Sequence, residues 1–235
     1  MQIHSSNNPA REAGIRLNAF LQEHEEREIL LLVSGGSALS ILEYVEADLL
    51  GPHVTFGMQD ERYSLDPKVN NFLQLKELPV YKKIIDADVS IIDSSVLDDE
   101  SPEELAERLN LIVGEWITEN HEGLVMTICG VGADGHTAGM FSFPEDKARF
   151  SQLFENPDRF FVSYNAGEKN QFPLRVTVTA TFIRRAVSRT IVFATGEGKR
   201  DAITCLLNKD GSVHSTPARL LLEVPHAELF TDLKF

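Results

Sequence analysis

The 235-residue sequence predicts an α/β fold, with residues 1–235 forming a single domain in which a mostly parallel, Rossmann-like sheet carries helices on both faces. Two observations support this. A continuous apolar run of strand length occurs at 29–33, and mostly apolar segments of similar length occur at 54–58 and 124–129, as is typical of strands buried on both faces. Two of these runs end in glycine-rich turns, and amphipathic helical patterns lie between the runs. Strands that alternate with helices in this way favour a parallel sheet.

The N-terminal region begins with an amphipathic helix, for which Asn8 is the expected cap and Pro9 the first residue. The run 29–33 forms the next strand. After the glycine turn at 34–37, a helical pattern extends to about residue 50. We therefore expect a strand, a turn and a helix in immediate succession.

The run 54–58 is expected to form another strand, and a polar segment at 59–71 follows it. This segment has too many turn formers and charges for a core element, so we expect a surface loop with a functional role. Further along, the sequence 101–104 fits a capping box with proline at the first helical position. It predicts a helix that runs to about residue 120.

The second half of the chain repeats the alternation. The strand expected at 124–129 runs into a second glycine-rich turn at 130–136, and further strands are expected at 175–179 and 190–194, each followed by a helical stretch. Parallel strands place their carboxyl ends at one edge of a sheet, and ligands bind beyond that edge. The residues that directly follow the strands are therefore the candidates for a site.

Composition argues against several functions. A formal net charge of −14 repels nucleic acid, and no basic stripe offsets it. No apolar run is long enough to cross a bilayer and no signal-peptide core is present, so we expect a cytoplasmic protein with neither nucleic-acid nor membrane partners. Cys129 and Cys205 lie in apolar segments without metal-site spacing, so we expect buried thiols, no disulfide and no metal.

The negative charge would also repel a small phosphorylated substrate, so an enzyme for such a substrate must gather cations in a local pocket. Between a strand and a helix, Ser34, Gly35, Gly36 and Ser37 could present backbone N–H groups to a phosphate. The alternative is a tight turn that uses glycine only for its permitted backbone angles.

Two cations follow or begin expected strands. Lys199 lies near the expected start of a helix, where it could reach a phosphate or could simply be solvated. Arg175 is either an anion contact or an edge-exposed strand residue. The sequence leaves both pairs of alternatives open.

Two acidic motifs also follow strands. His136 can accept a proton near neutral pH, and Asp134 is close enough to orient it, which makes His136 the best candidate for a general base. Asp60, Glu61 and Arg62 could project into the cleft at the end of their strand. The alternative for this triplet is a set of solvated loop or ion-pair residues.

Together these motifs, in their order along the chain, resemble those of the glucosamine-6-phosphate isomerase/6-phosphogluconolactonase family. The similarity extends over about residues 29–223, and residues 130–138 are similar to the family signature glycine-x-glycine-x-aspartate-glycine-histidine-threonine-alanine. The other matching segments are 34–37, 60–62, 70–71, 175–179, 196–199 and 217–220.

The resemblance implies the lactonase branch, because the deaminases carry a glutamate five positions beyond the histidine and this chain has Phe141 there. It implies a cofactor-free hydrolase, monomeric or homodimeric, that opens 6-phospho-D-glucono-1,5-lactone to 6-phosphogluconate in the oxidative pentose phosphate pathway. An amino-sugar phosphate deaminase or isomerase remains an alternative, as does a non-catalytic sugar-phosphate-binding protein.

The resemblance also implies roles for individual residues. His136 would be the base, Asp134 would orient it, and Arg62 would stabilise the oxyanion or contact the phosphate. The residues expected to bind the substrate and its phosphate are Ser34, Gly35, Gly36, Ser37, Asp60, Asn71, Arg175 and Lys199.

Overall fold

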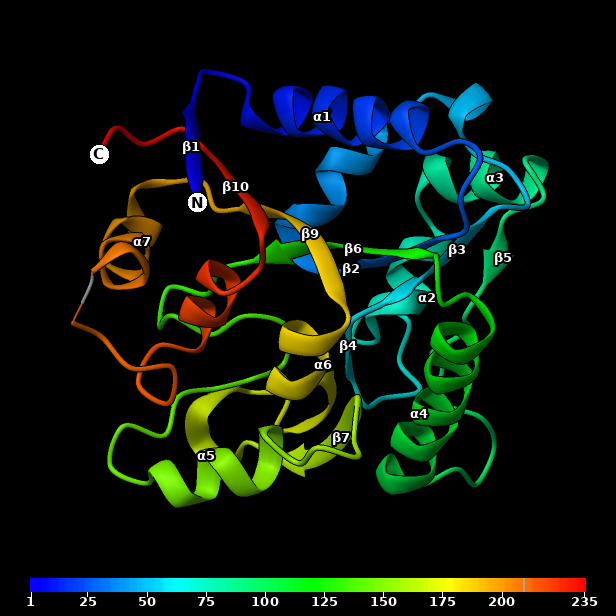
Figure 1. Ribbon diagram of the computed structural model, residues 1–235. Helices are drawn as coiled ribbons and strands as arrows, with labels where there is room; N and C mark the ends of the chain where they lie inside the picture. The colour runs from blue at the N-terminus through cyan, green and yellow to red at the C-terminus, as the bar shows by residue number, and fades with distance from the viewer. Residues whose placement is uncertain (209) are drawn as a thin grey trace.

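A parallel sheet forms the centre of the computed structural model, which describes residues 1–208 and 210–235 (Figure 1). Within these residues its strands have the order β1-β10-β9-β6-β2-β3-β5, and all neighbouring pairs are parallel. The strands are β1 (Gln2–Ser5), β2 (Ile29–Val33), β3 (Val54–Met58), β5 (Ser90–Ile91), β6 (Leu124–Gly130), β9 (Val187–Phe193) and β10 (His226–Thr231). The predicted fold class is confirmed.

A smaller antiparallel sheet has the order β4-β8-β7, from β4 (Asp60–Arg62), β8 (Leu174–Val178) and β7 (Phe161–Asn165). The strand expected at 175–179 therefore exists, but it lies outside the parallel sheet. Only Gln59 separates β4 from the end of β3, so the chain leaves the main sheet and then pairs with β8. Because of this pairing, Arg62 and Arg175 lie opposite each other.

Helices cover both faces of the main sheet. Successive side chains of a strand point to opposite faces, and β2 is apolar throughout, so both faces must be buried. Ile29, Leu31 and Val33 pack on one face with α1 (Pro9–Glu23), and Leu30 and Leu32 pack on the other with α4 (Pro102–Glu119). Elements on the α1 face also include η1 (Gly36–Tyr44), α2 (Asn71–Lys76) and α3 (Pro79–Asp86). Those on the α4 face include α5 (Lys147–Phe154), α6 (Ala180–Arg185) and the small sheet.

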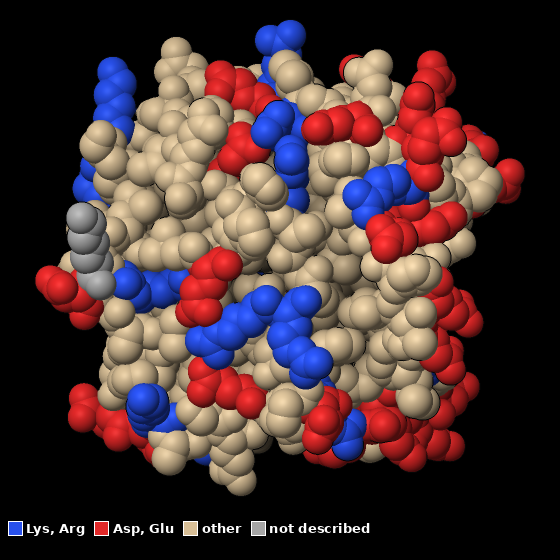
Figure 2. All heavy atoms as spheres, viewed as in Figure 1, with Lys and Arg blue, Asp and Glu red and all other residues tan. Residues whose placement is uncertain are grey.

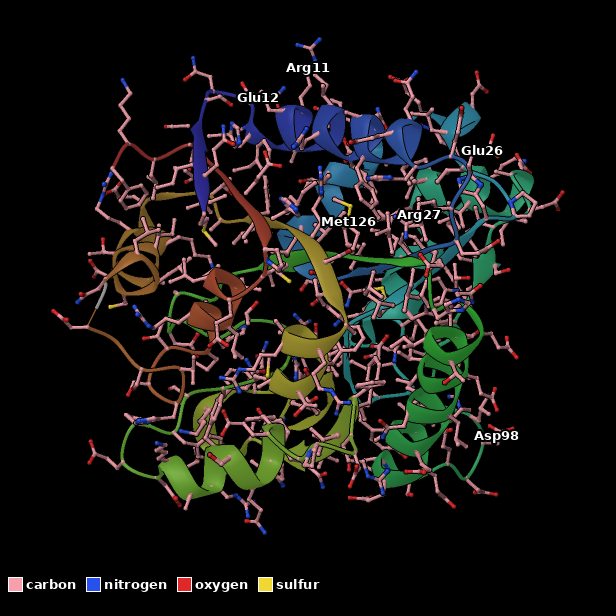
Figure 3. The ribbon with its side chains drawn as sticks, in the orientation of Figure 1. Arg11, Glu12, Glu26, Arg27, Asp98 and Met126 are labelled. Carbon is pink, nitrogen blue, oxygen red and sulfur yellow. The ribbon has the colours of Figure 1, made fainter. Side chains whose placement is uncertain are left out.

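Local sequence signals fix the helix ends as expected. The side chain of Asn8 accepts a hydrogen bond from the backbone N–H of Arg11, and Pro9 opens α1. At the start of α4, Ser101 and Glu104 form the predicted capping box. Figure 3 shows Arg11 extending from α1 into solvent and Met126 lying in the interior beneath this helix.

Three sequence expectations are wrong. The helical stretch to residue 50 consists of two 3₁₀ segments, η1 and η2 (Ala47–Leu49), because the extended backbone of Val45 ends the first one. The segment 59–71 is not a surface loop throughout, since both of its ends are buried and only its middle is exposed. Cys205 is exposed on α7 (Arg200–Leu207), whereas Cys129 is buried.

The surface carries the acidic excess of the composition. Figure 2 shows many Asp and Glu side chains on the viewed face, with Lys and Arg in small groups between them. In the described part of the chain, no helix combines the length and the apolar character needed to span a membrane.

Candidate active site

The segments that follow β2, β3, β6 and β9 converge at one edge of the main sheet, where they line a cleft of about 190 Å³. Every predicted site residue lines this cleft except Asp134, which contacts the cleft residue His136. The lining residues are Ser34, Gly35, Gly36, Ser37, Asp60, Arg62, Asn71, Gly130, Val131, Gly132, His136, Ala138, Arg175 and Lys199.

The turn after β2 requires its glycines for two different reasons. Gly36 has a φ of +68°, which side chains disfavour. At Gly35, an added Cβ would lie 2.4 Å from Oδ1 of Asn71, so the absent side chain lets the Asn71 amide approach. Ser34 links this turn to the next one, since its hydroxyl accepts a hydrogen bond from the N–H of Gly130 at 3.3 Å. Residues 34–37, at the start of η1, therefore line the cleft from a turn that is tied to its neighbours.

His136 and Asp134 form a hydrogen-bonded pair. Nδ1 of His136 lies 2.5 Å from Oδ1 of Asp134, and this oxygen also accepts the backbone N–H of His136 at 3.2 Å. Burial acts to raise the pKa of Asp134, but the hydrogen bonds from His136 outweigh it and hold that pKa below its ordinary value. A carboxylate on Nδ1 leaves Nε2 as the nitrogen that can accept a proton.

Three cationic side chains converge on the same cleft. Arg175 is only 4% exposed and bonds to Oδ2 of Asp60 at 2.7 Å, but its Nε and Nη1 have no partner among the described residues. Its burial makes the edge-exposed alternative wrong. Burial and the nearby charge of Arg175 lower the pKa of Arg62, and burial lowers that of Lys199. Unpaired donors and mutual repulsion favour binding of an anion here.

Glu61 organises the cleft wall, a role that its sequence motif did not indicate. Its carboxylate accepts hydrogen bonds from the backbone N–H groups of Asn71 and Phe72 at 2.7 and 2.9 Å and from the Ser94 hydroxyl at 2.7 Å. Burial raises its pKa to about 8. These bonds fix the start of α2, from which the Asn71 amide donates to the carbonyl of Asp60 at 2.8 Å. Asp60 and Glu61 are buried, so they are not solvated loop residues, although Asp60 forms an ion pair as the alternative allowed.

Four lining residues were missed by the sequence reasoning, namely Gly130, Val131, Gly132 and Ala138. They present backbone or small side chains, which carry no chemical signal of their own. The glycine spacing was the available signal, because a Cβ on Gly132 would lie 2.1 Å from Nδ1 of His136. In the described part of the chain, no cluster of three His, Cys, Asp or Glu residues could hold a metal ion.

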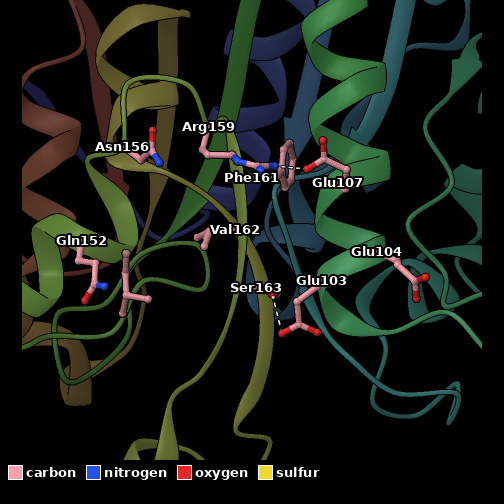
Figure 4. Close-up of a pocket in the computed structure, with 10 residues that line it drawn as sticks. Glu103, Glu104, Glu107, Gln152, Asn156, Arg159, Phe161, Val162 and Ser163 are labelled. Carbon is pink, nitrogen blue, oxygen red and sulfur yellow. Dashed lines mark hydrogen bonds and ion pairs between the residues drawn. The ribbon is translucent and has the colours of Figure 1, made fainter.

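A larger hollow of about 490 Å³ lies between α4, the end of α5 and β7 (Figure 4). It contains none of the predicted site residues. Its cationic group is paired, since Arg159 forms an ion pair with Glu107, and Glu103 accepts a hydrogen bond from Ser163. The smaller cleft, with three convergent cations and two donors on Arg175 left unpartnered within the described chain, is therefore the better candidate site.

Residues 6–230 match the family of glucosamine-6-phosphate isomerases/6-phosphogluconolactonase. The chain belongs to this family. A 6-phosphogluconolactonase of Borreliella burgdorferi is 30% identical over 107 residues, which cover 46% of this chain and 42% of that protein. The match thus spans less than half of the curated relative.

Solved structures of 6-phosphogluconolactonases have the same fold as this chain. The chain is similar to 6-phosphogluconolactonase from Plasmodium vivax with a TM-score of 0.76 and 14% identity, covering 98% of this chain and 89% of that one. For 6-phosphogluconolactonase from Trypanosoma brucei, the TM-score is 0.71 and the identity 20%, over 98% and 95% of the two chains.

Proposed function

We propose that this chain is a 6-phosphogluconolactonase, a hydrolase that opens 6-phospho-D-glucono-1,5-lactone to 6-phosphogluconate. The observation that carries the proposal is a single cleft in which a His136–Asp134 pair faces three cations, in a chain of net charge −14. The pair suits activation of water, and the cations suit a phosphorylated substrate. We expect the enzyme to act in the cytosol, in the oxidative pentose phosphate pathway.

In the proposed mechanism, the phosphate binds the turn at 34–37 together with Lys199 and Arg175, and this binding positions the lactone carbonyl near His136. Nε2 of His136 removes a proton from water as the water oxygen attacks the carbonyl carbon. Arg62 stabilises the resulting oxyanion, a contribution typically of about 3 kcal/mol. When the intermediate collapses, the ring C–O bond breaks and His136 returns the proton to the ring oxygen.

The alternative functions are less well supported by the same cleft. Five positions beyond His136, Phe141 is buried and apolar, so it cannot take part in a proton relay for amine chemistry. A protein that only bound sugar phosphates would need the cations but not the hydrogen-bonded pair of His136 and Asp134. The lactonase uses both parts of the cleft.

The test is hydrolysis of freshly generated 6-phosphoglucono-δ-lactone, corrected for spontaneous opening. Unphosphorylated gluconolactone, His136→Asn and the exposed-histidine control His121→Asn are assayed in parallel. We expect fast hydrolysis that requires the phosphate, a loss of about 10²- to 10⁴-fold in His136→Asn, and a parental rate in the control. A parental rate in His136→Asn would show that another group is the base, and no acceleration by the parent would reject the lactonase.

A further inference from the structure

The turn that follows His136 is held by side chains of the small sheet. The backbone N–H of Gly139 donates to the Thr177 hydroxyl of β8 at 2.9 Å. From β7, the Tyr164 hydroxyl donates to the carbonyl of Gly139 at 2.6 Å and accepts the N–H of Phe141 at 3.1 Å. Burial raises the pKa of Tyr164, so its hydroxyl keeps the proton that it donates. One hydroxyl therefore closes the turn from both ends.

This turn has a conformation that needs such support. Ala138 has a φ of +48°, a left-handed backbone region that non-glycine residues disfavour. If the Tyr164 hydroxyl were removed, Gly139 and Phe141 would be left with buried, unpaired backbone groups, which is unfavourable. The turn would then relax toward a less strained conformation.

The turn places the ring of Phe141 against the proposed base. Phe141 is 1% exposed, and its ring centroid lies 4.5 Å from that of the His136 imidazole, with 36° between the ring planes. The Arg175 guanidinium carbon lies 5.8 Å from the same ring centroid. Movement of Phe141 would thus free the imidazole to rotate away from Asp134.

We propose that Tyr164 and Phe141 are positioning residues for His136. The Tyr164 hydroxyl fixes the turn, the turn holds the Phe141 ring in place, and the ring keeps Nδ1 of His136 on Asp134 with Nε2 available to the cleft. Neither residue is assigned contact with the reacting atoms. The kinetic consequence rests on the proposed lactonase function, whereas the effect on the imidazole does not.

Four variants separate positioning from general destabilisation. Tyr164→Phe deletes only the hydroxyl, and Phe141→Leu removes the ring but retains an apolar side chain. Tyr81→Phe deletes a hydroxyl on α3 for which no hydrogen bond within the described residues is found, and Phe143→Leu removes a nearby ring that packs on Phe154 instead. The ¹⁵N resonances of the imidazole report which ring nitrogen carries the proton, and urea unfolding reports stability.

In the parent protein, we expect the neutral imidazole of His136 to carry its proton on Nδ1. In Tyr164→Phe and Phe141→Leu we expect a mixture of tautomers and a kcat lowered about 10- to 100-fold with KM changed less than about threefold. The controls should alter neither property.

Tyr164→Phe is conservative enough that the variant should fold, so an unchanged His136 tautomer in it would overturn the proposal. So would a kcat that falls only in proportion to the unfolded fraction. If the tautomer changes but the parent hydrolyses no lactone, the positioning role stands and the proposed function fails. The two failures are therefore distinguishable.

Discussion

Removing the charge of Arg175 should cost far more stability than removing that of a surface arginine. The side chains of Arg175 and Asp60 are each 5% exposed, and their N–O distance is 2.7 Å. In Arg175→Gln, Asp60 is left as a buried, uncompensated charge, which costs about 3–5 kcal/mol. Because a domain is stable by only about 5–15 kcal/mol, this loss is a large fraction of the total.

Arg184→Gln is the matched control. Arg184 pairs with Glu155 and Glu223 at 2.7 Å each, but its side chain is 33% exposed. Solvent screens such pairs, so the control should lose about 1 kcal/mol or less. Unfolding is followed in urea at 25 °C by the fluorescence of Trp116, the one tryptophan of the chain.

The complementary variant, Asp60→Asn, also removes one partner. It leaves Arg175 opposite Arg62 on the neighbouring strand without the carboxylate that pairs with Arg175. The double variant Asp60→Asn/Arg175→Gln removes both buried charges, so we expect its loss to be about 2 kcal/mol smaller than the sum of the single losses. Additive losses, or a loss in Arg175→Gln no larger than in Arg184→Gln, would refute the reasoning.

Three further predictions concern the cleft. Gly132→Ala would place a Cβ 2.1 Å from Nδ1 of His136, so the rate of lactone hydrolysis should fall at least about 10-fold. In the control Gly114→Ala the new Cβ meets nothing within 4 Å, so the parental rate should be kept. Equal rates in the two variants would contradict this geometry. Burial raises the pKa of Glu61 to about 8, so its stabilising contribution is present below its ordinary pKa of 4.5 and is lost as the pH rises to about 8, by up to about 1.4 kcal/mol per pH unit. Urea unfolding between pH 5.5 and 8.5 should therefore show a flatter pH dependence of stability in Glu61→Gln than in the parent. Parallel curves would argue against Glu61 as the source of the dependence. Burial lowers the pKa of Lys199, so as the pH is raised Lys199 should lose its charge before the ordinary lysine pKa of 10.5 is reached. The affinity for inorganic phosphate, measured by calorimetry, should fall over that pH range in the parent but not in Lys199→Met. The same pH dependence in the variant would exclude Lys199 as its source.

The sequence determined much of the fold because the decisive signals are local. Apolar runs at 29–33, 54–58 and 124–129 form parallel strands, and the caps at Asn8 and Ser101 begin helices where predicted. Since parallel strands end at one edge of a sheet, motifs far apart in sequence could be assigned to one cleft without knowledge of the strand order. Short edge strands such as β1 and β5 were missed because a few residues carry little periodicity.

Only the tertiary structure decided which charges are buried and what they contact. Asp60 and Arg175 are 115 positions apart, and their burial depends on β8 pairing with β4 rather than joining the main sheet. Likewise, the ring of Phe141 and the hydroxyl of Tyr164 meet the His136 turn only through the small sheet. Local sequence patterns record how each segment prefers to fold. The environment of a charge is set by residues distant in sequence, so the cleft's electrostatics and supporting contacts required the folded chain.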